Sequence, residues 1–230
     1  MGGYILDTET TGIVDPVPVS VAWVKIDSVL SVVEHFESRY RPGKPISFGA
    51  MATHHIIESD LVDCEPFSKF QLPDDCHFLI GHNVDFDWTA IGKPDVKRIC
   101  TLALARSLWT DLDSHTLVAL LYALSDPDDH TDVRDHVGDA HDALTDAYLT
   151  LELLGHIIRK LVGVTYPLDY NELWEVSERS RIPKVMAFGK HKGTPITQIP
   201  SDYKRWLLNQ PDVDPYLVQA LQCGGRSETR

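Results

Sequence analysis

The first forty residues alternate short apolar runs with turn-forming residues, which is the pattern of β-strands joined by tight connections. The apolar run at residues 4–6 is followed by two longer runs rich in β-branched side chains, at residues 17–26 and 29–40. β-Branched residues favour strands, and the Pro and Gly residues after the third run favour a turn. The pattern therefore predicts a three-stranded antiparallel meander at the start of the chain.

Compact apolar runs and helical patterns alternate in the rest of the chain. Residues 77–81 and 96–100 predict two more short strands, and Asn83 is well placed to cap a helix that follows the first of them. Further segments with helical character are residues 50–62, 101–109, 116–124, 171–180, 203–208 and 216–221. The Asp-rich segment 125–139 lacks the spacing of a calcium-binding loop and predicts a solvated acidic loop.

The clearest helix is predicted over residues 140–161. Its apolar residues recur at steps of three and four, which is the period of a helix with one buried face. These residues are Leu144, Ala147, Leu151, Leu154 and Ile158. Asp146 lies beside this stripe and is therefore expected to be half-buried, in a setting where a carboxylate requires a partner.

Composition indicates a soluble globular protein. The 230 residues are 43% hydrophobic and 24% charged, with a formal net charge of −13. This charge argues against a broad basic face that coats nucleic acid, but not against a local grip on a strand end. Four cysteines without paired spacing indicate reduced thiols, and no apolar run is long enough to span a membrane. We therefore expect a cytoplasmic protein that does not act on membranes.

One segment is basic, although the chain as a whole has a negative net charge. Between residues 182 and 206 there are five cations and a single acid, Asp202, and aromatic residues stand among the cations. The cations are Lys184, Lys190, Lys192, Lys204 and Arg205, and the aromatic residues are Phe188, Tyr203 and Trp206. Basic residues interleaved with aromatic ones favour contact with nucleic acid. A solvated hairpin with a small core is the alternative.

Two pairs of acidic residues near apolar runs are candidates for a metal site. In a strand, Asp7 and Glu9 point to the same face at the end of an otherwise apolar run. Asp85 and Asp87 fall in the first turn of a helix, where the helix dipole alone would favour them. Clustered carboxylates are usually neutralised by a divalent cation that prefers oxygen ligands, such as Mg²⁺.

Three motifs connect these acids in order along the chain. They are Asp-Thr-Glu-Thr-Thr-Gly at 7–12, His-Asn-Val-Asp-Phe-Asp at 82–87 and His-Asp-Ala-Leu-Thr-Asp at 141–146. Together they resemble the DnaQ-like exonuclease superfamily in its DEDDh branch, in which a His stands five residues before the last Asp. The resemblance implies an α/β protein with an RNase H-like fold, in which helices flank a central mixed β-sheet.

The resemblance also implies a role for each matching residue. Asp7, Glu9, Asp87 and Asp146 would be the metal-binding carboxylates, and His141 would be the general base. Two Mg²⁺ or Mn²⁺ ions in such a site can hold the attacking and leaving oxygens of a phosphodiester bond. A histidine can accept a proton near neutral pH.

Other residues in or beside these motifs are candidates for substrate contact. They are Thr8, Thr10, Ile13, His82 and Asn83. Ile13 follows the first motif and is hypothesised to be an apolar wedge against the terminal bases. A turn residue that packs locally is the alternative reading of this position.

The segment after Pro167 resembles the C-terminal extension of exonuclease X-like proteins. The matching residues are Met-Ala-Phe-Gly-Lys-His-Lys-Gly at 186–193, together with Tyr203 and Trp206. We therefore expect an exonuclease domain at 1–165 and a small extension at 166–230 that contacts nucleic acid. The implied activity is that of a metal-dependent 3′→5′ exodeoxyribonuclease, which releases 5′-mononucleotides from DNA 3′ ends. Single-stranded ends are the expected substrate and duplex ends a second option.

Several alternatives stay open at this stage. An RNA-trimming enzyme of the ribonuclease T or oligoribonuclease type would carry the same acids, because these contact phosphate and metal. A nuclease-like module that binds nucleic acid without catalysis is less consistent with the retention of all five site residues. Many relatives dimerise, so a homodimer is open as well.

Overall fold

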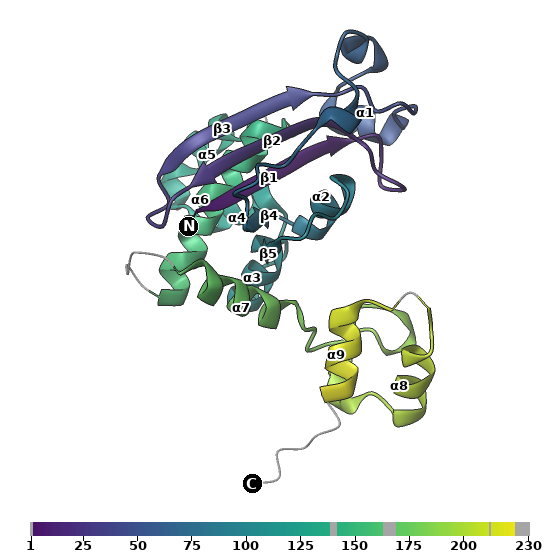
Figure 1. Ribbon diagram of the computed structural model, residues 1–230. Coiled ribbons are helices and arrows are strands. Elements are labelled where there is room, and N and C mark those ends of the chain that lie inside the picture. Colours follow the sequence, from purple (N-terminus) through teal and green to yellow (C-terminus); the bar gives the residue numbers. More distant parts are fainter. Residues whose placement is uncertain (1, 139–141, 163–168, 212, 224–230) are drawn as a thin grey trace. The chain divides into compact units, whose positions relative to one another are not determined.

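Two units make up the chain, Met1–Ser177 and Glu178–Arg230, here called the large and the small unit. The computed structural model describes residues 2–138, 142–162, 169–211 and 213–223 (Figure 1). The domain boundary expected at 165/166 lies outside the described residues. Each unit has an apolar core of its own.

A five-stranded mixed sheet forms the centre of the large unit, in the order β3-β2-β1-β4-β5. The strands are β1 (Gly3–Thr10), β2 (Pro18–Ile26), β3 (Val32–Arg39), β4 (Phe78–Gly81) and β5 (Lys97–Cys100). β1 and β3 each pair antiparallel with β2, which confirms the predicted meander. β4 is parallel to both β1 and β5. Since the carboxyl ends of parallel strands meet at one edge, β1 and β4 lead into the same region.

Helices flank this sheet, as the family resemblance implied (Figure 1). The described helices of the large unit are α1 (Phe48–His54), α2 (Val84–Ala90), α3 (Thr101–Leu108), α4 (Leu117–Leu124), α5 (His130–His136) and α6 (Ala143–Val162). α7 (Tyr170–Arg181) begins in the large unit and ends in the small one. No helix among the described residues is long and apolar enough to cross a membrane.

α6 packs across β1 and β2 and also contacts α3 and α4. Its buried face is wider than the predicted stripe. The residues of α6 with at most 2% exposure are Ala143, Ala147, Leu149, Thr150, Leu153, Leu154, Ile157 and Ile158. Leu144 and Leu151 of the predicted stripe are only partly buried. A helix that contacts a sheet on one side and two helices on another buries more than one narrow stripe.

Three predicted elements differ from the structure for local reasons. The expected acidic loop at 125–139 was wrong, since it contains a 3₁₀ turn and α5, and Val133 packs against the core. The helix expected at 50–62 corresponds to α1, which begins earlier and already ends at His54, because His55 adopts a left-handed φ of 59°. The third strand begins only at Val32, because the Asp27 carboxylate accepts hydrogen bonds from the amides of Val29 and Ser31 and forms a turn.

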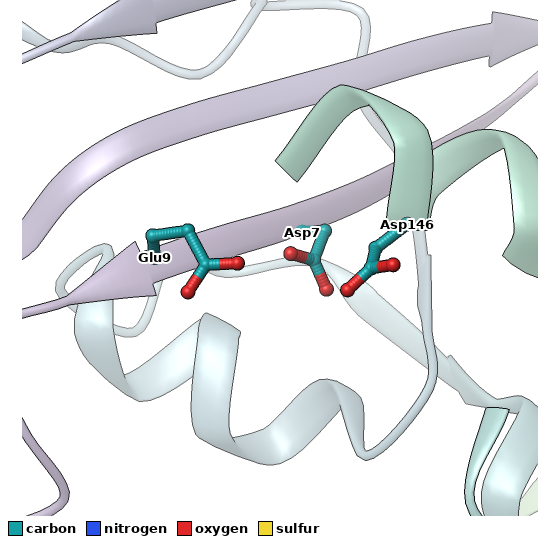
Figure 2. A group of neighbouring side chains, drawn as sticks. All are labelled: Asp7, Glu9 and Asp146. Atoms are coloured by element: carbon teal, nitrogen blue, oxygen red, sulfur yellow. The ribbon is translucent and has the colours of Figure 1, made fainter. Parts of the chain in front are cut away.

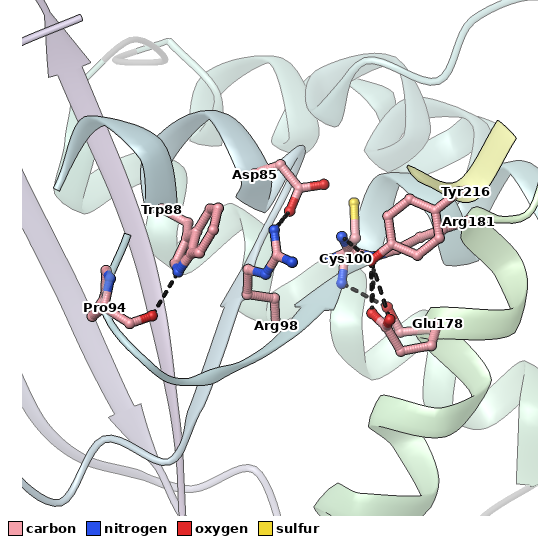
Figure 3. Close-up of polar contacts among 9 residues, drawn as sticks. Asp85, Trp88, Pro94, Arg98, Cys100, Glu178, Arg181 and Tyr216 are labelled. Atoms are coloured by element: carbon pink, nitrogen blue, oxygen red, sulfur yellow. Dashed lines mark hydrogen bonds and ion pairs between the residues drawn. The ribbon is translucent and has the colours of Figure 1, made fainter. Parts of the chain in front are cut away.

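The small unit is built around two helices and a tight turn. α8 (Ser201–Leu208) and α9 (Pro215–Cys223) confirm the helices predicted there, with earlier starts. Their core consists of Met186, Ile196, Ile199, Leu207, Leu217, Ala220 and Leu221. Tyr216 of α9 donates a hydrogen bond to Glu178 over 3.0 Å and accepts one from Arg181 over 3.0 Å (Figure 3). These bonds fix α9 to the last turn of α7.

We expect Leu153→Ala to lower the free energy of unfolding by about 2–5 kcal/mol, because it empties a fully buried site between α6 and the sheet. Urea unfolding of both proteins measures the difference. Leu151→Ala, in the same helix at a partly buried position, serves as the matched control and should cost clearly less. Equal losses from the two variants would contradict the assignment of the buried face.

Candidate active site

Three carboxylates from two distant segments converge at the end of β1. Asp7 and Glu9 lie on the same face of this strand, and Asp146 lies in the first turn of α6. Each of the three offers an oxygen, and these oxygens lie within 4.8 Å of one another. Figure 2 shows the Asp146 carboxylate directed at that of Asp7, with Glu9 further along the strand. The structure thus brings together three of the four predicted metal ligands in one cluster.

The neighbouring strand leaves room for these acids. In the antiparallel pairing, Asp7 stands opposite Ala22 and Glu9 opposite Ser20. Residues directly opposite in such a pair point to the same face, so the two acids have small neighbours there. The register shifts between Glu9 and Thr10. Such bulges are frequent next to active sites, where they redirect side chains.

Asp87, the fourth predicted ligand, is not one of these three but is held against the same strand by Thr8. Its carboxylate oxygen accepts hydrogen bonds from the Thr8 amide over 3.1 Å and from the Thr8 hydroxyl over 2.7 Å. Asp87 is only 4% exposed. The turn between β4 and α2 makes this contact possible, because a Cβ on Gly81 would lie 3.1 Å from the Leu6 carbonyl oxygen. A side chain there would push α2 away from β1.

Asp85 lies on the same helix but has a different partner. Its carboxylate forms an ion pair with Arg98 on β5 (Figure 3). The Arg98 guanidinium lies 4.0 Å from the centre of the Trp88 ring, and the Trp88 indole donates a hydrogen bond to the Pro94 carbonyl over 2.8 Å. Sequence spacing left Asp85 and Asp87 equivalent. The structure separates them, because only Asp87 contacts the strand that carries the other acids.

Asp142 is likewise distinct from Asp146, although both belong to the third motif. The Asp142 carboxylate accepts hydrogen bonds from the Thr145 amide over 3.2 Å and the Thr145 hydroxyl over 3.1 Å. It therefore caps the start of α6, as acidic residues commonly do. Residues 139–141 lie outside the described part of the chain, so His141 is known only from its place in the sequence.

The clustered acids are electrostatically unfavourable without a cation. Burial raises the pKa of Asp7 well above its ordinary value, and the charges of Asp87, Asp146 and Glu9 add to this rise. Burial, together with Asp146 and Asp87, raises the pKa of Glu9 to about 8.

Burial also raises the pKa of Asp87, with a contribution from Asp146, although the hydrogen bonds from Thr8 oppose the rise. All of these shifts reflect an excess of negative charge in a partly desolvated place.

The donor set fits hard divalent cations. All the converging groups are carboxylates, and Mg²⁺ and Mn²⁺ prefer oxygen ligands, whereas softer metals prefer sulfur or imidazole. A bound cation would also offset the repulsion that raises the pKa values of Asp7 and Glu9. The cluster is therefore chemically suited to the metal ions that the sequence predicts.

A cavity of about 680 Å³ opens beside Glu9. It lies between the end of β1, the loop that follows, α1 and Phe86 of α2. Its lining includes Thr8, Thr10 and Ile13, three of the residues predicted to contact substrate. Ile13 is 86% exposed, which leaves little room for the local packing that was the alternative to an apolar wedge. The size of the cavity is in the range of small-molecule sites.

His54 lines this cavity, whereas from the sequence the adjacent His54 and His55 could touch a ligand but were expected to be surface residues. Its ring is buried, its Nδ1 accepts a hydrogen bond from the Ile56 amide over 3.0 Å, and its Nε2 lies 3.1 Å from the Thr10 carbonyl. Nε2 must then be the protonated ring nitrogen, and its N–H donates a hydrogen bond to the Thr10 carbonyl oxygen. Burial lowers the pKa of His54, which favours this neutral form. The sequence could not predict the burial of His54 or its contact with Thr10, because both depend on how the loops close.

The two remaining candidates for substrate contact have other surroundings. Nε2 of His82 donates to the His115 carbonyl over 2.9 Å, and its Nδ1 lies 3.1 Å from the Thr101 hydroxyl. Both ring nitrogens thus contact protein, and for His82 we favour a structural role. Asn83 occupies the predicted N-cap of α2 but with a left-handed φ of 73° and without a capping bond from its side chain. The expected side-chain cap was therefore wrong.

Comparison with known proteins identifies the family. Residues 4–154 match the exonuclease family model (RNase_T), so the chain belongs to the exonuclease family. Exodeoxyribonuclease 10 of Escherichia coli K12 is 28% identical over 215 residues, which cover 90% of this chain and 91% of that protein. A PolC-type DNA polymerase III of Bacillus cereus is 28% identical over 183 residues, or 73% of this chain but only 12% of the polymerase.

Solved structures agree with this assignment. Exonuclease X in complex with 5′ overhanging duplex DNA has a TM-score of 0.59 and 27% identity, and the match covers 76% of this chain and 98% of that one. Escherichia coli exonuclease I in complex with a dT13 oligonucleotide has a TM-score of 0.52 and 20% identity, over 69% of this chain and 41% of that one, which supports the fold.

The DnaQ-like resemblance and the RNase H-like fold are thus confirmed, and the chain is a 3′→5′ exonuclease. The alternative of a binding module without catalysis is set aside.

The raised carboxyl pKa values predict how stability depends on pH. Without metal, the folded protein keeps protons on these acids at pH values where the unfolded chain has released them. The free energy of unfolding should therefore fall as pH rises from about 4 through the raised pKa of Glu9, about 8. Mg²⁺ should raise the melting temperature more at pH 8 than at pH 5.

Glu9→Gln isolates this effect from other titrating groups. In metal-free buffer at pH 8 it should melt above the wild type, with a smaller difference at pH 5, and Glu34→Gln, at an exposed position on β3, should not. A Glu9→Gln protein less stable than wild type at pH 8 would show that the acids do not repel one another.

Proposed function

We propose that this exonuclease is a metal-dependent 3′→5′ exodeoxyribonuclease that releases 5′-mononucleotides from DNA ends. The observation that carries the proposal is the convergence of Asp7, Glu9 and Asp146. Asp87 accepts hydrogen bonds from Thr8, the residue between Asp7 and Glu9 on β1. Clustered carboxylates beside a cavity of suitable size are what phosphodiester hydrolysis with divalent cations requires. The proposed cofactors are two Mg²⁺ or Mn²⁺ ions.

The four carboxylates Asp7, Glu9, Asp87 and Asp146 would hold these ions. When bound, such a pair stabilises both the attacking and the leaving oxygen of an in-line displacement. The role of Thr8 is to hold Asp87 in place through two hydrogen bonds to one oxygen. These bonds restrict the rotation of the Asp87 carboxylate.

His141 is proposed as the general base. Its assignment rests on the third motif, where it precedes Asp146 by five residues. A ring nitrogen with an ordinary pKa near 6.5 can take a proton from the attacking water at neutral pH. This role requires the neutral imidazole, so activity should decline at acidic pH.

The cavity beside Glu9 is proposed to take the 3′-terminal nucleotide. Thr8 and Thr10 line it with polar groups, and Ile13 stands at its rim with 86% exposure. Phe48, at the start of the adjacent α1, is 88% exposed. Two exposed apolar side chains near one opening are suited to contact unpaired base faces.

DNA is proposed as the substrate in preference to RNA. Support comes from the 28% identity to exodeoxyribonuclease 10 and from the likeness to exonuclease X in complex with 5′ overhanging duplex DNA. RNA remains the alternative, because the acidic cluster contacts phosphate in either case. We further propose that the protein acts in the cytoplasm. A homodimer stays a prediction.

We predict that Asp87→Asn lowers the rate of nucleotide release by at least about 100-fold, because it removes a charge from the metal cluster. The assay uses 5′-labelled single-stranded DNA, 5′ overhanging and blunt duplex DNA, and RNA, with Mg²⁺ or EDTA. Wild type with Mg²⁺ should shorten DNA from the 3′ end and yield 5′-mononucleotides, and RNA should react more slowly.

Asp85→Asn is the matched control, since it makes the same change two residues away on the same helix. It should keep nearly full activity, because Asp85 contacts Arg98 rather than the cluster. Equal losses from both variants would contradict the assignment of Asp87. Faster hydrolysis of RNA than of every DNA substrate would contradict the proposed substrate.

We predict that His141→Ala loses most of its turnover but keeps its affinity for divalent cations. The imidazole is assigned to proton transfer and not to metal binding, so calorimetric titration with Mn²⁺ should give wild-type affinity. Asp146→Ala is the comparison, because it should lose both turnover and affinity for Mn²⁺. If His141→Ala weakened Mn²⁺ binding as much as Asp146→Ala does, His141 would not be the base.

A further inference from the structure

We propose that the small unit carries a second nucleic-acid surface, which binds an unpaired strand through aromatic stacking and contacts to phosphate. The surface consists of the turn Phe188–Lys192 and the exposed side of α8, and is called the turn–α8 surface below. It goes beyond the proposed function, which involves the large unit alone.

The distribution of charge is the first support for this proposal. The large unit has 12 Lys and Arg against 29 Asp and Glu, a net charge of −17. The small unit has nine against five, a net charge of +4. Nucleic acid is a polyanion, and its binding depends on cations that replace its counterions. The small unit is the part of the chain whose charge complements the substrate.

The aromatic rings of the turn–α8 surface form a connected series. The ring of His191 lies edge-on to Tyr203 with centres 4.5 Å apart, and Tyr203 lies 5.3 Å from Trp206. The turn lies so close to α8 that a Cβ on Gly189 would meet the Tyr203 hydroxyl at 3.0 Å. Gly189 also has a φ of 67°, which favours glycine. The backbone thus places His191 against the helix.

Exposed rings and cations occur together on this surface. Trp206 is 53% exposed and Phe188 is 49% exposed, which is unusual for large apolar side chains in a unit with its own core. Lys190 and Lys192 flank His191 and are exposed, as is Arg205 beside Trp206. Cations next to accessible rings allow one strand to contact phosphates and stack its bases over the same stretch.

The arrangement favours an unpaired strand over a duplex. Aromatic rings stack on base faces, and these are covered by neighbouring base pairs in a duplex. Each stacked base contributes about 1–3 kcal/mol in single-strand binding proteins. A surface of cations alone would bind either form, so the rings determine the preference. We therefore expect the turn–α8 surface to hold single-stranded DNA.

Binding by the full-length protein tests this directly. Fluorescence anisotropy follows a labelled oligo-thymidine of about twenty nucleotides in EDTA, where hydrolysis is suppressed. Trp206→Ala should weaken binding about five- to 100-fold, and Trp206→Phe should restore most of it because a ring is retained. An abasic strand of the same length should bind the wild type more weakly and should not distinguish the Trp206 variants.

Charge variants test the phosphate contacts. The double variant Lys190→Gln/Lys192→Gln should reduce the slope of log affinity against log salt by about 1.4, the value for two contacts to a single strand. Lys69→Gln/Lys160→Gln is the matched control, since it removes two exposed cations from the large unit and should leave the slope unchanged. Circular dichroism melting confirms that each variant is folded.

Hydrolysis of a p-nitrophenyl ester of thymidine 5′-monophosphate separates this proposal from the proposed function. This ester has no strand beyond the cleaved bond, so Trp206→Ala should hydrolyse it at the wild-type rate. No hydrolysis by the wild type would count against the proposed function alone. The turn–α8 surface is refuted if Trp206→Ala binds oligo-thymidine as the wild type does. It is also refuted if the abasic strand binds the wild type equally well, or if the Lys69/Lys160 control loses as much slope.

Discussion

Mutual repulsion among buried carboxylates is the constraint on which the site depends. Asp7, Glu9 and Asp146 place their oxygens within 4.8 Å of one another, and burial together with the charges of Asp146 and Asp87 raises the pKa of Glu9 to about 8. Such a cluster is unfavourable to folding by itself. It persists because β1 is buried on both faces and α6 is packed along much of its length against the sheet. A rigid framework of this kind holds the acids ready for cations.

The sequence predicts those parts of the protein that depend on local pattern. The meander and α6 were evident because strand and helix periods are local properties, and the three acidic motifs were recognised through their resemblance to a known family. Contacts between distant segments were not. His54 contacts Thr10 and His82 contacts His115 through loops whose closure no local pattern encodes. Spacing also left Asp85 and Asp87 equivalent. The family resemblance selected Asp87, and the structure supplies a physical difference, since Asp87 accepts hydrogen bonds from Thr8 whereas Asp85 pairs with Arg98.

The opposite net charges of the two units are consistent with different roles, hydrolysis in the large unit and substrate capture in the small one. The large unit needs carboxylates for its cations, and its net charge of −17 opposes the approach of DNA. Bound cations offset this only at the cluster itself. A small unit with a net charge of +4 and exposed rings would supply attraction to the strand that the large unit lacks. Substrate capture and hydrolysis would then reside in separate parts of one chain.

Anomalous diffraction from crystals grown with Mn²⁺ and thymidine 5′-monophosphate tests the central claim most directly. Two Mn²⁺ peaks are predicted at the end of β1, within coordination distance of Asp7, Glu9, Asp87 and Asp146, with the nucleotide phosphate bound beside them. The contrary result would be Mn²⁺ bound only elsewhere, such as along the Asp-rich segment around α5, with the clustered acids left without metal.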